Sequence, residues 1–251
     1  MRKFSKLLVM LVGLVGLLGL NAMPAVAYST NPSLHFGGWQ VVPGGDVSDA
    51  DVTISIPYTF PNNDRVAFWT GVEGYGTNQA LIQGGVAFDT SGACLLFYEI
   101  VPHTGAAWPI YVHSCYSGDS LYIHVRYYNG SASWHFIESG LGAFNQTFTS
   151  TGRTYDNANR GESMVEKVST WPLQHYAFPA NVNSAYFTAP RIYANAGGGW
   201  HYYTEISTRY LWWMCASTPP TCSNSNTSST LSSTGGLDGY AGFYTYWWHS
   251  S

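Results

Sequence analysis

Carboxylate and carboxamide side chains are the groups through which this chain could do chemistry, because charged residues make up only 10% of its 251 residues. An amide or acid inside an apolar run is therefore conspicuous, and Gln83 stands in such a run, residues 80–88. Strand alternation would place Gln83 on one face with Leu81, Gly85 and Ala87. Gly85 and Ala87 are small, so they leave room for an extended substrate to lie against the face. The alternative, which periodicity alone does not separate from this one, is that Gln83 lies on a solvated face of the strand.

Three glutamates stand in comparable surroundings. Glu99 lies between apolar residues in the run Phe97–Val101, where it is either a solvated edge residue or a groove carboxylate. Glu162 and Glu166 fall on one face in a strand, and their spacing also places them on one face of a helix. Two carboxylates on one face can shift each other's pKa. Shifted pKa values are common among groups that exchange protons with a substrate. In a helix they would instead form an ordinary surface pair with Lys167.

Other catalytic templates are missing from the sequence. It contains no H-E-x-x-H, no G-x-S-x-G and no P-loop, and its eight His residues are scattered without ligand spacing. We therefore expect no metal and no cofactor. Ten Lys and Arg against fourteen Asp and Glu give a net charge of -4. Nucleic acid is not expected as a partner, because its binding requires concentrated positive charge.

The elements that must position these groups are predicted to be strands. Tyr (19), Trp (10) and Gly (27) are plentiful, as is typical of strands and turns. From about residue 52, short β-branched and aromatic runs alternate with Gly, Asn, Ser and Pro clusters, which predicts an antiparallel sandwich or barrel. The predicted strands are Val52–Phe60, Val66–Val72, Ala80–Asp89, Cys94–Val101, Leu121–Tyr128, Ser133–Glu138, Phe144–Thr149, Ser163–Val168, Ala185–Phe187, Trp200–Trp212 and Tyr240–Trp248.

The N-terminus has the pattern of a secretory signal peptide over residues 1–27. Three basic residues precede an apolar run, Leu7–Leu20, and Ala25–Ala27 has the A-x-A pattern of a cleavage site. We expect a secreted, extracellular protein that makes no membrane contact after cleavage; an uncleaved membrane anchor is the alternative. Residues 28–51 would then be a short N-terminal segment, and residues 52–251 one β-sandwich domain.

Export permits disulfides, and the chain has four cysteines, Cys94, Cys115, Cys215 and Cys222. Three pairings are possible. We favour Cys94 with Cys115 and Cys215 with Cys222, because the second pair brackets a short loop that a disulfide would close. A zinc site is the competing interpretation, but no C-x-x-C or C-x-x-H spacing occurs.

Several runs together resemble the glutamic peptidases, or eqolisins, a family of secreted acid endopeptidases. The similarity covers most of residues 52–251, with the runs in the family's order and at similar spacing. The runs are Trp69-Thr70-Gly71-Val72-Glu73-Gly74, Ala80-Leu81-Ile82-Gln83-Gly84-Gly85-Val86, Tyr98-Glu99-Ile100-Val101-Pro102, Gly118-Asp119-Ser120 and Gly161-Glu162-Ser163-Met164-Val165-Glu166.

The resemblance implies a fold and a site. The fold would be a β-sandwich of two packed antiparallel sheets, of the concanavalin A-like or jelly-roll type. The family's catalytic Gln and Glu fall on Gln83 and Glu162, and its substrate-binding groove positions fall on Glu73, Phe97 and Glu99. The chain would be a monomer that hydrolyses polypeptide substrates.

The chain also departs from the family pattern. Phe97 replaces a Trp, Ala87 an Asp and Val101 a Tyr.

Activity should peak in acid, because an unperturbed Glu titrates near pH 4.3. A carbohydrate-binding or glycoside-hydrolysing sandwich is the main alternative, since abundant Trp and Tyr suit sugar stacking and two carboxylates suit glycoside hydrolysis. A non-catalytic member of the fold is the third possibility.

Overall fold

The computed structural model describes part of the chain in detail. The described residues are 29–33, 36–56, 66–74, 81–88, 93–101, 110–116, 118–128, 133–139, 144–149, 158–167, 184–195, 198–215, 220, 222–224 and 230–247. The signal peptide and cleavage site predicted within residues 1–28 lie outside them. In this part of the chain, no helix has the length and apolar character needed to cross a membrane.

The described chain is almost entirely strand, with one short 3₁₀ helix, η1 (Tyr203–Glu205). The strands are β1 (Ser29–Ser33), β2 (Phe36–Val42), β3 (Val47–Ser55), β4 (Val66–Gly74), β5 (Leu81–Phe88), β6 (Cys94–Val101), β7 (Ile110–Cys115), β8 (Ser120–Tyr128), β9 (Ser133–Ser139), β10 (Phe144–Thr149), β11 (Ala158–Lys167), β12 (Ser184–Ala194), β13 (Gly199–Tyr202), β14 (Thr208–Cys215), β15 (Thr230–Thr234) and β16 (Phe243–Trp247).

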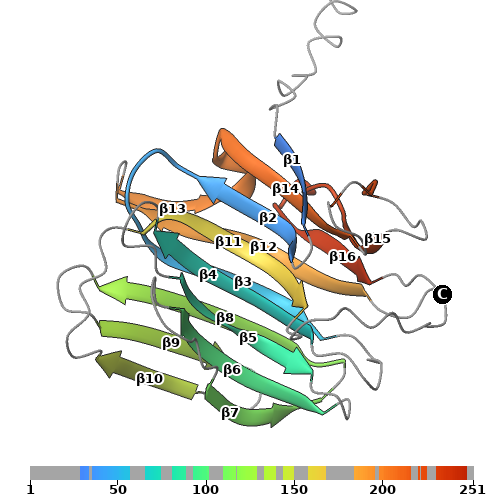
Figure 1. Ribbon diagram of the computed structural model, residues 1–251. Coiled ribbons are helices and arrows are strands. Elements are labelled where there is room, and N and C mark those ends of the chain that lie inside the picture. The colour runs from blue at the N-terminus through green and yellow to red at the C-terminus, as the bar shows by residue number, and fades with distance from the viewer. Residues whose placement is uncertain are drawn as a thin grey trace, which may run out of the picture.

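These strands form one hydrogen-bonded path that folds over into two layers (Figure 1). The order is β10-β9-β8-β3-β12-β16-β15-β14-β2-β11-β4-β5-β6-β7, with β13 beside β12 and with β1 parallel to β14. We call β14, β2, β11, β4, β5, β6 and β7 the front layer, and β10, β9, β8, β3, β12 and β16 the back layer. Neighbours along the path are antiparallel, which confirms the predicted antiparallel β-sandwich.

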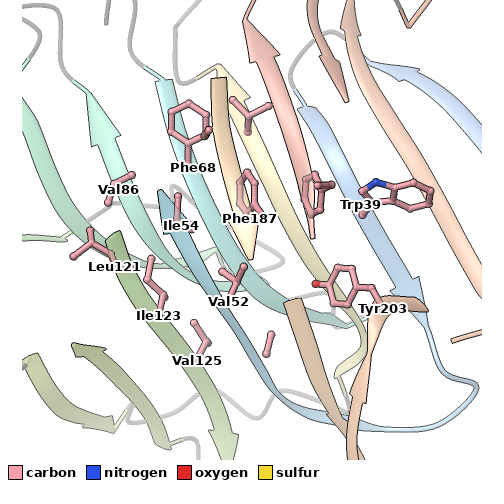
Figure 2. Packing of buried hydrophobic residues seen from close by; sticks show 14 of the residues in the cluster. Trp39, Val52, Ile54, Phe68, Val86, Leu121, Ile123, Val125, Phe187 and Tyr203 are labelled. Carbon is pink, nitrogen blue, oxygen red and sulfur yellow. The ribbon is translucent and has the colours of Figure 1, made fainter. Parts of the chain in front are cut away.

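The main core fills the space between the two layers (Figure 2). Phe68 of β4 in the front layer contacts Phe187 of β12 in the back layer, with ring centroids 6.4 Å apart. Phe187 also stacks on Phe243 of the neighbouring strand β16, at 4.7 Å. Residues that alternate with the core residues of the front layer face outward, because successive side chains of a strand point to opposite sides.

Several strand boundaries differ from those predicted; for example, β12 continues to Ala194, beyond the expected end at Phe187. The expected strand Trp200–Trp212 is wrong, because η1 interrupts it: Tyr203 turns into the core, fully buried, and β14 starts only at Thr208. Both β3 and β11 begin five residues earlier than predicted. Strand β2 pairs with β11 and β14, so the sandwich includes residues before position 52, where the sequence suggested that the domain starts.

The two predicted disulfides are confirmed. Cys94 and Cys115 lie opposite each other on β6 and β7 and are bonded. Cys215, at the end of β14, is bonded to Cys222. The indole of Trp213 donates a hydrogen bond to the carbonyl of Cys222 at 2.9 Å, so the closed loop is also held against β14.

A cluster of charged side chains lies on the outer face of the back layer, around Asp49 of β3. Its carboxylate is buried and accepts hydrogen bonds from Ser48, His124 and Arg126, each at 2.6 Å. Burial raises the pKa of Asp49, but these three partners outweigh the burial and hold the pKa below its ordinary value. The cluster therefore favours the ionised carboxylate in the folded state.

We predict that Asp49→Asn destabilises the protein by about 3 kcal/mol at neutral pH, because it removes the negative charge that pairs with Arg126 in a buried cluster. The pKa is lower in the folded than in the unfolded chain, so the stabilisation is present above about pH 4 and is lost as the pH falls through the folded value. Urea unfolding of wild type and variant at pH 7 and pH 3 measures this. The control is Asp46→Asn; an equal deficit at both pH values would contradict the prediction.

Candidate active site

The candidate residues meet on the outer face of the front layer, in one row that crosses six strands. Pairing register sets the row: each member lies directly opposite the next on the neighbouring antiparallel strand, and directly opposite side chains point to the same face. From β6 to β14 the row is Glu99, Gln83, Gly71, Glu162, Gln40 and Tyr210.

Gly71 separates the two predicted catalytic residues. Gln83 and Glu162 both lie opposite it, on either side of β4, so their Cα atoms are two strand spacings, or about 10 Å, apart. A Cβ added at Gly71 would lie only 2.5 Å from the carbonyl oxygen of Ile82 and 3.1 Å from Leu81 Cδ1. The position therefore accepts only glycine, and the row has no side chain between the amide of Gln83 and the carboxyl of Glu162.

Gln83 is buried, with 2% of its surface exposed, which favours the groove over the solvated face. Its Nε2 donates a hydrogen bond to Glu99 Oε2 at 2.6 Å. Its Oε1 is buried and makes no hydrogen bond to any described residue. A buried amide oxygen ordinarily has a partner, so Oε1 and the second N–H of Nε2 are available to water or to a ligand.

Glu162 is a buried acid whose surroundings disfavour its charge. Its Oε1 accepts a hydrogen bond from Gln40 Nε2. Burial, together with the charge of nearby Glu73, raises the pKa of Glu162 well above its ordinary value, while Gln40 and Arg160 act in the opposite direction. Arg160 also pairs with Glu73, at 3.4 Å. The carboxyl can therefore hold or release a proton closer to neutral pH than an ordinary glutamate.

A buried polar network fixes the backbone beneath Glu162. The hydroxyl of Thr70 on β4 donates to the carbonyl oxygen of Glu162 at 2.8 Å and lies 3.1 Å from the hydroxyl of Ser163. Ser163 in turn lies 3.1 Å from the phenol of Tyr203, the η1 residue that interrupts the predicted strand. The turn at η1 thus supports β11 at the position of the candidate catalytic acid.

A cavity of about 220 Å³ opens over Glu162. Polar and charged groups line one part of it and apolar side chains the rest. The lining residues are Phe36, Gln40, Trp69, Glu73, Leu81, Arg160, Glu162, Met164 and Trp212. Gln83 is not among them; Leu81, two residues before it on the same face, lies at the cavity. Within the described residues, no group of three or more His, Cys, Asp or Glu is placed to hold a metal ion.

The apolar floor of this face is a second, smaller cluster that includes Trp69, Phe97 and Met164. The indole of Trp69 donates a hydrogen bond to Glu166 Oε2 at 2.9 Å. Burial, followed by the charge of Glu99, raises the pKa of Glu166 to about 7, although the bond from Trp69 opposes the shift. Glu166 is therefore a second proton-holding group on the same face.

The structure places every predicted site residue on this one face. Glu73 and Glu162 line the cavity, Glu99 bonds to Gln83, and Phe97 lies opposite Gly85 in the next row of the face. Sequence reasoning missed Gln40, Trp69 and Arg160. Gln40 carried a usable signal, since it is the one amide in the apolar run 36–42.

Comparison with known proteins rests on structure alone. No protein-family model matches the chain, and no curated protein matches it. Among solved structures it is similar to scytalido-glutamic peptidase with a peptide-based transition-state analogue, at a TM-score of 0.61 and 14% identity, over 86% of this chain and 98% of that one. It is similar to SCP-B, a member of the eqolisin family in complex with the tripeptide Ala-Ile-His, at 0.57 and 14%, over the same shares.

This chain has the fold of the glutamic peptidases. The glutamic-peptidase fold extends over most of the chain, and the matched structures are themselves covered almost in full. At 14% identity the likeness concerns the arrangement of the strands, so the chemistry has to be argued from the residues of the front layer.

We predict that Glu166→Gln changes how stability depends on pH. With a pKa of about 7 in the folded protein and about 4.3 in the unfolded chain, the wild type loses stability as the pH rises from about 4 to 7. The variant should lose about 2 to 3 kcal/mol less over this interval. Urea unfolding at both pH values tests this, with Glu205→Gln, an exposed acid, as control. Parallel losses in wild type and Glu166→Gln would contradict it.

Proposed function

We propose that this chain is a secreted acid endopeptidase in which Gln83 and Glu162 act on one water molecule. One observation carries the proposal: a buried amide with an unpartnered oxygen and a buried acid lie on one face, separated only by Gly71. The solved structures of this fold that the chain resembles are peptidases, one with a peptide-based analogue and one with a tripeptide. The two disulfides suit an extracellular protein.

The mechanism follows from what each group can donate or accept. Ionised Glu162 takes a proton from the water, which attacks the peptide carbonyl carbon and forms the new C–O bond. The oxygen of Gln83 helps to hold that water, and its free N–H donates to the oxyanion that develops. Glu162 then delivers the proton to the leaving nitrogen as the C–N bond breaks, so that the acid ends ionised again.

The carbohydrate alternative fits this site less well. A glycosidase needs two carboxyl groups about 5 Å or more apart, on either side of the glycosidic bond. The acid that acts on Glu162 is Glu73, whose charge raises the pKa of Glu162, and Glu73 is itself paired with Arg160 at 3.4 Å. The amide of Gln83, which the peptidase mechanism uses, would have no role in the glycosidase.

We predict that Gln83→Ala lowers kcat/KM on a denatured protein substrate by about 100- to 1,000-fold, because the oxyanion loses a donor. Glu162→Gln should lose more, because no base remains. The measurement is digestion of casein at the pH of highest wild-type activity, with pepstatin present to exclude two-aspartate proteases, alongside a polysaccharide panel.

Glu205→Gln, which makes the same acid-to-amide change at an exposed site, is the matched control and should keep wild-type activity. Circular dichroism and thermal unfolding verify that each variant is folded. Wild-type turnover by a folded Gln83→Ala or Glu162→Gln variant would remove the proposed dyad. Hydrolysis confined to the polysaccharides would instead favour a carbohydrate-active enzyme.

We predict that Glu73→Gln moves the acidic limb of the pH profile downward. Activity requires ionised Glu162, whose pKa lies above its ordinary value partly because of Glu73, so the wild-type limb should lie above about pH 4.5. Removing the charge of Glu73 lowers the pKa of Glu162, and activity then persists at lower pH. The profile of kcat/KM from pH 2 to 8 measures the shift; a limb that stays in place or rises would refute it.

A further inference from the structure

The site contains a second amide–acid pair that the proposed mechanism does not use. Gln40 of β2 lies directly opposite Glu162 of β11, on the side away from Gly71. Its Nε2 donates to Glu162 Oε1, as the Nε2 of Gln83 donates to Glu99. The row therefore holds two such pairs, one on each side of the glycine.

The surroundings hold Gln40 firmly in this position. It is 6% exposed, and its chain neighbours Trp39 and Val41 are buried in the main core on the opposite face. Two residues away, Gly38 has φ of 147° and faces Met164; a Cβ there would lie 2.2 Å from the carbonyl oxygen of Ser163. This close approach fixes the spacing between β2 and β11, and the burial of Gln40 limits the directions in which its amide can point.

We propose that Gln40 is a positioning residue whose amide fixes one oxygen, and with it the plane, of the Glu162 carboxylate at the cavity. The inference rests on the proposed function for its role in the reaction. Gln40 itself touches the acid and lines the cavity, and neither step of the mechanism assigns it a proton. A donor to one oxygen favours the ionised form, which is the form that accepts a proton from water.

Other groups around Glu162 set the background against which Gln40 acts. Glu73 on β4 disfavours its ionisation, and Arg160 on β11 favours it. The phenol of Tyr203 lies close enough to Glu162 for their charges to interact, and Tyr210 of β14 is the residue opposite Gln40. Gln40 is neutral and donates to the carboxylate of Glu162, so replacing it changes the hydrogen bond without adding or removing a charge.

The decisive measurement is the titration of Glu162 itself. Carbon-13 NMR of the side-chain carboxyls, with Glu162→Gln to assign the signal, gives its midpoint in wild type, Gln40→Met and Gln40→Asn. Met keeps the length of the side chain without a donor, and Asn keeps the amide but is one carbon too short to reach. We expect the midpoint to rise by about 1 pH unit in both variants, because a hydrogen bond to an ionised group is lost.

Val42→Met is the matched control, because Val42 lies on the same face of β2 and outside the cavity; it should leave the midpoint unchanged. If Gln40→Met does not fold, Gln40→Asn gives the answer. In the digestion assay, the acidic limb should rise by the same amount, with kcat about tenfold lower at pH values below the wild-type midpoint and KM little changed. A role in folding alone would lower stability and leave the limb in place.

The NMR result separates this inference from the proposed function. A raised midpoint in a protein that digests no peptide supports the positioning of Glu162 and overturns the peptidase. An unchanged midpoint in both Gln40 variants overturns the positioning role, whether or not the wild type digests protein.

Discussion

The pairing register of β5, β4, β11 and β2 is the constraint on which the candidate site depends. Side chains alternate between the faces of a strand, so a slip of one residue would send Gln83 or Glu162 into the main core. In the observed register both face outward, with Gly71 between them. The glycine matters as much as the two polar residues, because any side chain at that position would collide with the backbone of β5.

The two layers shift the pKa values of their acids in opposite directions. On the back layer, Asp49 is surrounded by cationic and hydroxyl donors that keep its pKa low, as suits a carboxylate that stabilises the fold. On the front layer, Glu162 is buried and Glu166 half-buried, with other acids nearby, and their pKa values rise. Burial of acids without full compensation is unfavourable for folding and useful for proton transfer. Amide donors offset part of this cost without adding charge.

Local patterns were sufficient where the feature itself is local. Alternation in the run around Gln83 predicted its face, and the bracketed loop between Cys215 and Cys222 predicted its disulfide. Patterns failed where a distant contact decides the outcome. Tyr203 stands in a run that is typical of a strand, yet the chain turns there because its ring fills the core and its hydroxyl meets Ser163 of β11. β2 was assigned outside the domain because its partners are more than a hundred residues away.

By itself, the sequence determined the all-β class and the alternation of faces, because each follows from residue type and spacing along the chain. It favoured one of three possible disulfide pairings, because a short loop separates Cys215 from Cys222. It also supplied the acids and amides of the site. Tertiary structure alone decided that Glu162 lies between Gly71 and Gln40, that Gln83 bonds to Glu99, and which acids are buried together. Those outcomes depend on which strands become neighbours, and pairing between distant strands is set by the packing of the whole sandwich.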